Sequence, residues 1–162
     1  MALKHLSLTN YRAFTRLDMD LPSRPLILVG ANAQGKTSLL EAVYYLATFD
    51  SFHAQSDKQL INFLAAGESL AVARIVADFE ETHTSKHAKK RRMEVRLIQE
   101  TNGISAAPRL RKELLLDGVK RKTGEAMGAF NAVLFLPHML RIVEGSPEER
   151  RRYLSLALGQ VQ

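Results

Sequence analysis

Residues Gly30 to Thr37 constrain the fold more than any other part of the chain. They read Gly-Ala-Asn-Ala-Gln-Gly-Lys-Thr and match the Walker A pattern, G-x-x-x-x-G-K-[ST], at every fixed position. This motif requires a buried strand that ends at its first glycine and a helix that begins near its lysine. Residues 26–29 are a short apolar run, and the spacing of apolar residues over 37–49 is helical. The sequence therefore predicts an α/β P-loop fold.

The residue types of the motif fit ATP and its magnesium ion. Gly30 and Gly35 let the backbone approach phosphates closely, and successive N–H groups form an anion-binding nest at a helix N-terminus. Lys36 would contact the β- and γ-phosphates, and the Thr37 hydroxyl would bind Mg²⁺. The predicted phosphate site comprises Gly30, Ala31, Asn32, Ala33, Gln34, Gly35, Lys36, Thr37 and Ser38.

The composition favours a globular protein with a polyanionic partner. The chain has 162 residues, 46% of them hydrophobic and 25% charged, which suffices for one domain with a core. Its 23 Lys and Arg against 17 Asp and Glu give a net charge of +6, which favours nucleic acid or nucleotides as partners. The absence of cysteine excludes disulfides and thiol catalysis. Apolar runs too short for a bilayer, and a beginning unlike a signal peptide, predict a cytoplasmic protein with no membrane contact.

The remaining patterns predict an antiparallel β portion and a second helix. Four segments have strand character: residues 3–8, 17–21, 70–80 and 93–99. Asp117-Gly118 follows an apolar run and is typical of a hairpin turn. Residues 132–136 read as a further buried strand. Ser146 and Pro147, followed by two glutamates, predict the start of a helix.

A Walker B carboxylate, which hydrolysis needs at the end of a second apolar strand, is not evident. Asp78 ends an apolar run, but that run contains Arg74 and no glutamate follows it directly. Asp117 follows three leucines, but Gly118 comes next, so it reads better as a turn residue. We therefore expect this chain alone to bind ATP without hydrolysing it appreciably.

Five segments along the chain are each similar to segments of one known family. They are residues 8–14, 29–47, 57–61, 116–135 and 145–154. The first reads Leu-Thr-Asn-Tyr-Arg-Ala-Phe, the second contains the Walker A motif, and the last combines Gly-Ser-Pro with three consecutive arginines. Together they resemble the RecF family of bacterial DNA-repair ATPases, which belongs with the ABC-type ATPase heads that include the SMC proteins.

The resemblance implies a fold, a function and partners. Residues 1–162 would form the N-terminal, Walker A lobe of an ABC-type head, with a mixed sheet around the P-loop helix and an antiparallel β portion. The C-terminal lobe, helical arm, signature motif and Walker B would lie beyond residue 162. In the family, ATP joins two heads into a homodimer that binds DNA at gaps and single-strand/double-strand junctions. With recombination mediator proteins, this dimer helps to load recombinase in DNA replication, repair and the SOS response.

Two regions depart from the family pattern. The family usually has several arginines where this chain has Asp50, His53 and Ser56. It usually has acidic residues where this chain has His138 and Met139. The second region corresponds to the loop that senses the γ-phosphate and magnesium in ABC ATPases, so its change predicts inefficient hydrolysis and is compatible with a divergent relative of RecF.

The resemblance also places one arginine, Arg12, near the nucleotide, and the alternative is a surface arginine at a strand end. Two basic segments are candidates for contacts with DNA phosphates: Lys89, Lys90, Arg91 and Arg92, and Lys120, Arg121 and Lys122. No aromatic residue lies within the first segment to stack on bases, so a solvated hairpin tip is its alternative interpretation.

Two other function classes fit parts of the sequence. A small P-loop kinase or nucleotide-transfer enzyme would need a Walker B acid and a lid arginine within this length, and the poor Walker B candidates argue against it. A DNA-binding module with a vestigial P-loop would not need its phosphate-binding side chains, and the intact Lys36 and Thr37 argue against it.

Overall fold

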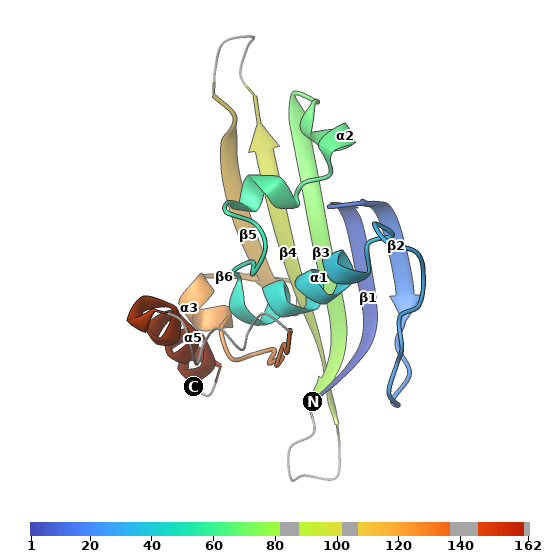
Figure 1. The fold of residues 1–162 in the computed structure, drawn as a ribbon, viewed down its shortest axis with the longest axis vertical. Helices are drawn as coiled ribbons and strands as arrows, with labels where there is room; N and C mark the ends of the chain where they lie inside the picture. Colours follow the sequence, from blue (N-terminus) through green and yellow to red (C-terminus); the bar gives the residue numbers. More distant parts are fainter. Residues whose placement is uncertain (82–87, 102–106, 137–145, 161–162) are drawn as a thin grey trace.

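A six-stranded antiparallel sheet forms the largest part of the molecule (Figure 1). The computed structural model describes residues 1–81, 88–101, 107–136 and 146–160. The strands are β1 (Ala2–Tyr11), β2 (Phe14–Asp20), β3 (Leu70–Glu81), β4 (Lys89–Glu100), β5 (Arg109–Leu116) and β6 (Val119–Arg121). Their order across the sheet is β2-β1-β3-β4-β5-β6, and all neighbouring pairs are antiparallel. The predicted antiparallel β portion is therefore confirmed.

Helix α1 (Lys36–Thr48) lies across one face of this sheet, which we call the inner face, and contacts β3 and β4 (Figure 1). Ala42, Tyr45 and Leu46 of α1 are fully buried in the core that helix and sheet share. The other helices of the described residues are the 3-10 helix η1 (Asp57–Leu60), α2 (Phe63–Ala66), α3 (Thr123–Ala126) and α5 (Pro147–Gly159). Both predicted helices are thus confirmed, the first as α1 and the second as α5. None of the described helices has the length and apolar character that crossing a membrane requires.

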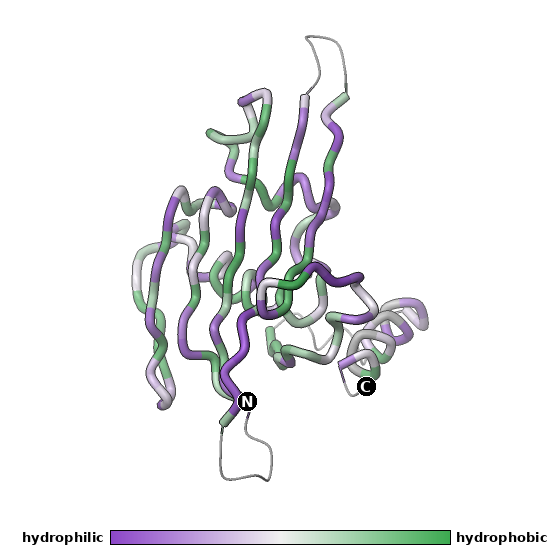
Figure 2. Tube along the Cα trace, turned by 180° about the vertical axis from the view of Figure 1, so that it is seen from behind, coloured by the Kyte–Doolittle hydropathy of each residue, from purple (hydrophilic) through white to green (hydrophobic). Residues whose placement is uncertain are grey.

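The alternation of residue types along the strands decides which side chains enter the core. Leu6, Ile75 and Val95 on the inner face are fully buried, and their polar neighbours in sequence point to the opposite, outer face. Figure 2 shows this alternation as hydrophobic and hydrophilic residues following one another along the strands. The four segments predicted as strands from the sequence are thus confirmed within β1, β2, β3 and β4.

The turn between β5 and β6 also matches its prediction. Asp117 and Gly118 have φ angles of 53° and 79°, so both lie in the left-handed region. A two-residue hairpin loop of this kind matches the right-handed twist of its strands, and Asp-Gly tolerates it at low cost.

The two apolar runs predicted as buried strands, 26–29 and 132–136, are not strands, and this prediction was wrong. Side chains within them are largely exposed: Ile27 is 82%, Val29 90% and Val133 96% exposed. A strand buried on both faces needs neighbouring strands for its backbone groups. Within the described ranges the six strands pair with one another in a single antiparallel sheet, and no strand pairs with either run. The α/β class is confirmed, and the described sheet consists of its antiparallel portion.

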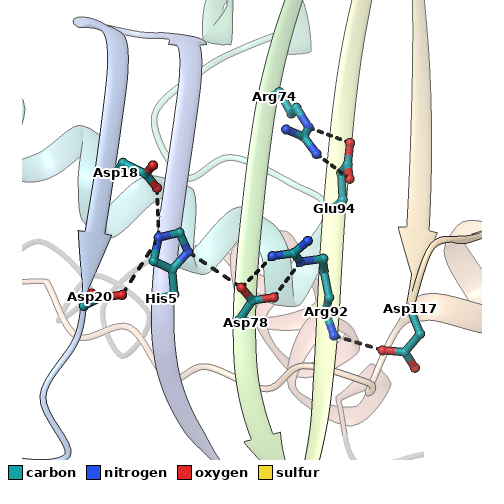
Figure 3. Close-up of polar contacts among 8 residues, drawn as sticks. All are labelled: His5, Asp18, Asp20, Arg74, Asp78, Arg92, Glu94 and Asp117. Atoms are coloured by element: carbon teal, nitrogen blue, oxygen red, sulfur yellow. Dashed lines mark hydrogen bonds and ion pairs between the residues drawn. The ribbon is translucent and has the colours of Figure 1, made fainter.

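Ion pairs between strands cover the outer face (Figure 3). Asp78 on β3 accepts two hydrogen bonds from Arg92 on β4, at 2.6 and 2.8 Å. Glu94 on β4 accepts two from Arg74 on β3, at 2.6 and 2.9 Å. The Arg92 hydrogen bonds lower the pKa of Asp78, and those of Arg74 lower the pKa of Glu94. Both carboxylates therefore remain ionised at lower pH in the folded chain than in the unfolded one.

We predict that Glu94 makes the free energy of unfolding depend on acid pH. The hydrogen bonds from Arg74 depress its folded-state pKa below the value of the unfolded chain. Its stabilisation is therefore complete above the unfolded pKa and is lost as the pH falls through the folded pKa. Urea unfolding between about pH 7 and about pH 3 should show a smaller loss of stability in Glu94→Gln than in the wild type. Equal losses in the two proteins would contradict this assignment.

Candidate nucleotide-binding site

The Walker A residues form a pocket at the N-terminus of α1. The pocket has a volume of about 230 Å³ and is lined by residues 32–38 and by Ala13, which lies in the turn between β1 and β2. The Lys36 ammonium donates hydrogen bonds to the carbonyl oxygens of Gly30 (2.8 Å) and Ala31 (2.6 Å). These two bonds hold the charged end of Lys36 over the loop.

Gly35 cannot be replaced by another residue without strain, for two separate reasons. Its φ angle of 87° lies in the left-handed region, at the residue that precedes the first turn of α1. A Cβ added to it would come within 2.6 Å of the Phe14 ring, whose carbon atoms pack directly against the glycine. The aromatic ring of the first residue of β2 therefore sets the position of the phosphate loop.

This arrangement can bind a chain of phosphates. The first N–H groups of a helix have no partner within the helix, and they carry the positive end of its dipole. The ammonium of Lys36 and the exposed residue Thr37 lie at the same end of α1. Anion-binding backbone, a lysine and a hydroxyl are the donors that ATP with its magnesium ion requires. The residues present therefore fit that ligand.

A buried carboxylate fixes α1 relative to the turn between β1 and β2. The Glu41 side chain is 3% exposed and accepts two hydrogen bonds from the Arg12 guanidinium, both at 2.7 Å. The Ser51 hydroxyl donates a third hydrogen bond to the same carboxylate at 2.5 Å. Arg12 also donates to the carbonyl oxygen of Gln59 at 3.0 Å. The carboxylate thus has partners from the turn and from the segment that follows α1.

The turn itself is held in an unusual backbone conformation by the segment 60–62. Asn10 and Arg12 have φ angles of 47° and 50°, which are uncommon for residues other than glycine. The backbone N–H of Arg12 donates to Leu60 O at 2.8 Å. The side chain of Asn62 donates to Arg12 O at 2.6 Å, and its backbone N–H donates to Asn10 O at 2.8 Å. These bonds compensate for the cost of the left-handed residues.

Lys112 is a structural residue at the C-terminal end of α1 that sequence reasoning missed. Its ammonium lies 2.8 Å from an Asp57 carboxylate oxygen and donates to Tyr45 Oη and to Phe49 O, each at 3.0 Å. It therefore joins β5, the C-terminal end of α1 and η1. A lysine within a strand pattern carries no sequence signal of such contacts, because its partners are distant in the sequence.

Comparison with known proteins agrees with this geometry. A family model described as an AAA ATPase domain matches residues 1–119. The chain belongs to this AAA ATPase domain family.

The individual proteins to which the chain is similar include RecF proteins of several bacteria. The DNA replication and repair proteins RecF of Exiguobacterium sp. and Thermomicrobium roseum are 35% and 38% identical to the chain, over 99% of its length. The solved structure of the recombination mediator protein RecF-ATP in the RecFOR pathway matches 99% of the chain with a TM-score of 0.75 and 26% identity. The chain spans 38%, 39% and 39% of these three proteins, respectively. The resemblance to the RecF family is thus confirmed.

The two Walker B candidates, Asp78 and Asp117, do not line the phosphate pocket. Asp78 lies within β3 on the outer face, where Arg92 binds it. Asp117 lies in the hairpin turn, where it accepts hydrogen bonds from Arg91 Nε at 2.7 Å and from the Arg92 backbone at 2.9 Å. The interpretation of Asp117 as a turn residue is confirmed.

The first basic segment is not uniformly solvated. Lys89 and Lys90 are exposed at the start of β4. Arg91, in contrast, is only 16% exposed and makes ion pairs with Glu81 (3.2 Å) and Asp117 (2.7 Å). The interpretation as a solvated hairpin tip is therefore wrong for Arg91, because antiparallel pairing places acidic side chains beside it. DNA contact by this segment stays a prediction and depends most on its two lysines.

The second basic segment is exposed throughout. Lys120 and Arg121 lie on β6, the short edge strand, and Lys122 follows it. Lys120 donates to a Glu113 carboxylate oxygen on β5 at 2.9 Å. DNA contact by these residues also stays a prediction.

The positions that depart from the RecF pattern belong to two regions. Asp50, His53 and Ser56 lie in the loop after α1, beside Ser51, which binds Glu41. His138 and Met139 lie outside the described residues.

We predict that Arg12 stabilises the fold through Glu41. Arg12→Ala would leave the Glu41 carboxylate buried without its cation, so the free energy of unfolding should fall by about 3–5 kcal/mol in urea denaturation. Arg16→Ala is the matched control, because Arg16 is four residues away in the sequence and its side chain is 81% exposed. This variant should change the free energy of unfolding little. The double variant Arg12→Ala/Glu41→Leu should recover part of the loss. Wild-type stability of Arg12→Ala together with weakened ATP binding would instead support the nucleotide contact that the resemblance implies.

Proposed function

We propose that the chain is the ATP-binding lobe of a RecF-like DNA replication and repair protein of the cytoplasm. ATP with Mg²⁺ is its ligand, bound by residues 30–38. The observation that carries this proposal is the phosphate pocket, in which Lys36 is held over a glycine-containing loop at the N-terminus of α1. The match to RecF-ATP supports the choice of nucleotide.

Exposed apolar side chains support the proposal that a further lobe packs against this one. Leu26, Ile27 and Val29 before the phosphate loop are 48%, 82% and 90% exposed. Val133 and Phe135 are 96% and 79% exposed. Clustered apolar exposure of this kind is typical of surfaces that another protein segment covers. We infer that the remaining part of such a protein, the C-terminal lobe of the RecF family, packs against these runs and pairs their backbone groups.

The whole protein would then act as the RecF family does. Two ATP-bound heads form a homodimer, which binds DNA at gaps or single-strand/double-strand junctions and works with recombination mediator proteins. Within this lobe, Lys89, Lys90 and the segment 120–122 would contribute phosphate contacts. The excess of basic residues, +6 for the chain, supports a nucleic-acid partner.

ATP affinity should depend on Lys36. Lys36→Ala removes a charge-assisted contact to phosphate oxygens that contributes about 1.5–3 kcal/mol, so calorimetry should show at least about a tenfold weaker affinity. The matched control is Lys90→Ala, which removes an exposed lysine from β4 and should leave ATP affinity unchanged. Equal ATP affinity in the wild type and Lys36→Ala would refute the phosphate site.

The chain alone should hydrolyse ATP at a negligible rate, because both carboxylates with a Walker B-like context are bound by arginines away from the phosphate pocket. A phosphate-release assay with ATP and Mg²⁺ measures this rate. Turnover that is abolished by Lys36→Ala would show that the prediction is wrong. Asp78→Asn and Asp117→Asn would then identify the carboxylate that binds the metal.

A further inference from the structure

Four arginines, one on each of β2, β3, β4 and β5, form a band across the outer face of the sheet. We call this set, Arg16, Arg74, Arg96 and Arg111, the arginine band. In the register, Arg16 and Arg74 both lie opposite Thr9, and Arg74 lies opposite Arg96. Arg111 lies opposite Ile98, two residues from Arg96 on the same strand. Residues in register, or two apart on a strand, share one face, so all four arginines are on the outer face.

Each arginine of the band has a carboxylate within 4.0 Å on the same face. Their side chains are 81%, 44%, 38% and 59% exposed, in the order of the band. Glu94 is only 8% exposed, and it accepts hydrogen bonds from Arg74 (2.6 Å) and Arg96 (2.5 Å). Glu113, 15% exposed, lies 3.6 Å from Arg111. A buried acceptor therefore holds the Arg74 and Arg96 guanidinium groups in place, whereas Arg16 lies near the 52% exposed Asp18.

A groove of about 440 Å³ runs beside the band over β1 and β3 (the same face appears in Figure 3). Its lining includes Arg16, Arg74 and Arg92 together with the side chains of Ser7 and Thr9. Guanidinium and hydroxyl groups are donors that bind phosphate oxygens, and arginine does so in a bidentate manner. Asp18, its one carboxylate, lies beside Arg16 at 4.0 Å.

We propose that the arginine band and this groove bind the phosphodiester backbone of duplex nucleic acid. Val76 and Ile98, two apolar residues beside the band, are 4% and 9% exposed, and Leu70 at the start of β3 is 53% exposed, so the face around the band is mainly polar and does not suit an apolar protein interface. The groove lining contains no Phe, Tyr or Trp that would stack on the bases of a single strand. The proposal rests on and deepens the nucleic-acid part of the proposed function, and it makes the band the main contact, ahead of Lys89, Lys90 and the segment 120–122.

The test removes two arginines of the band and compares them with two lysines elsewhere on the sheet. Arg16→Gln/Arg111→Gln changes the most exposed members of the band and leaves the Arg74, Glu94 and Arg96 cluster intact. Lys89→Gln/Lys90→Gln, which makes the same change of charge at the other candidate DNA contact, is the comparison variant. Fluorescence anisotropy with a labelled duplex, over a series of salt concentrations, gives the affinity and its salt dependence. Thermal melting verifies that each variant is folded.

We expect the band variant to bind the duplex about tenfold more weakly at low salt, and to lose about 1.8 from the slope of log K against log salt. The lysine pair should have the smaller effect. Arg16→Lys/Arg111→Lys, which keeps both charges, should recover the slope. Recovery by lysine separates phosphate neutralisation from a merely structural role of the arginines.

The proposal would be overturned by the absence of duplex binding in the wild type, by equal losses in the two Gln variants, or by a loss only in the lysine pair. Displacement of the duplex by polyglutamate at equal charge would show a general acidic-surface site, and would also overturn it. ATP titration of the same variants keeps the two proposals separate. If the duplex measurements overturn the arginine band while ATP affinity still depends on Lys36, the proposed nucleotide function stands.

Discussion

The buried carboxylate of Glu41 is the interaction on which the geometry of the site depends. An isolated charge at 3% exposure would be very costly, so the surrounding chain must supply donors for it. Arg12 supplies two hydrogen bonds and Ser51 a third. Because Glu41 lies in the second turn of α1, these bonds fix the helix against the turn between β1 and β2. The N-terminus of the same helix is the phosphate site.

The two residues on either side of Ala13 each contact α1. Arg12 binds Glu41 along the helix, and Phe14 packs against Gly35 at its beginning. Ala13, between them, lines the phosphate pocket. The shape of the pocket therefore depends on three consecutive residues that are not part of the Walker A motif. Arg12 has a left-handed backbone conformation, and the Asn62 side chain holds it by donating a hydrogen bond to Arg12 O.

The sequence predicts those parts of the structure that local patterns determine. The Walker A loop, α1 and the strands with period-two alternation follow from residue spacing, as does the Asp117-Gly118 turn. The runs 26–29 and 132–136 were predicted wrongly because an apolar run indicates that its side chains are buried, but it does not show which protein segment packs against them. The exposure of Val29 and Val133 shows that no segment of the described residues does so.

The contacts that hold α1 against the rest of the fold were less predictable, for a different reason. Glu41 and Lys112 are charged residues in helix and strand patterns, where charge ordinarily indicates exposure. Their partners are 29 and 67 residues away in the sequence, in Arg12 and Tyr45 respectively. A buried ion pair becomes visible only when the fold brings both members together. The same holds for Arg91, which reads as part of a basic run until pairing of β3 with β4 places Glu81 beside it.

Strand register links the two faces of the sheet, and therefore the two proposed sites. Ile75 and Val95 face α1, and the residues directly before them, Arg74 and Glu94, form an ion pair on the outer face. Slippage of one strand by a single residue would exchange these faces, exposing core residues and burying arginines. The apolar core that supports α1 thus also sets the positions of the arginines. The energy of burying Ile75 and Val95 helps to preserve a charged surface that local side-chain interactions alone would specify only weakly.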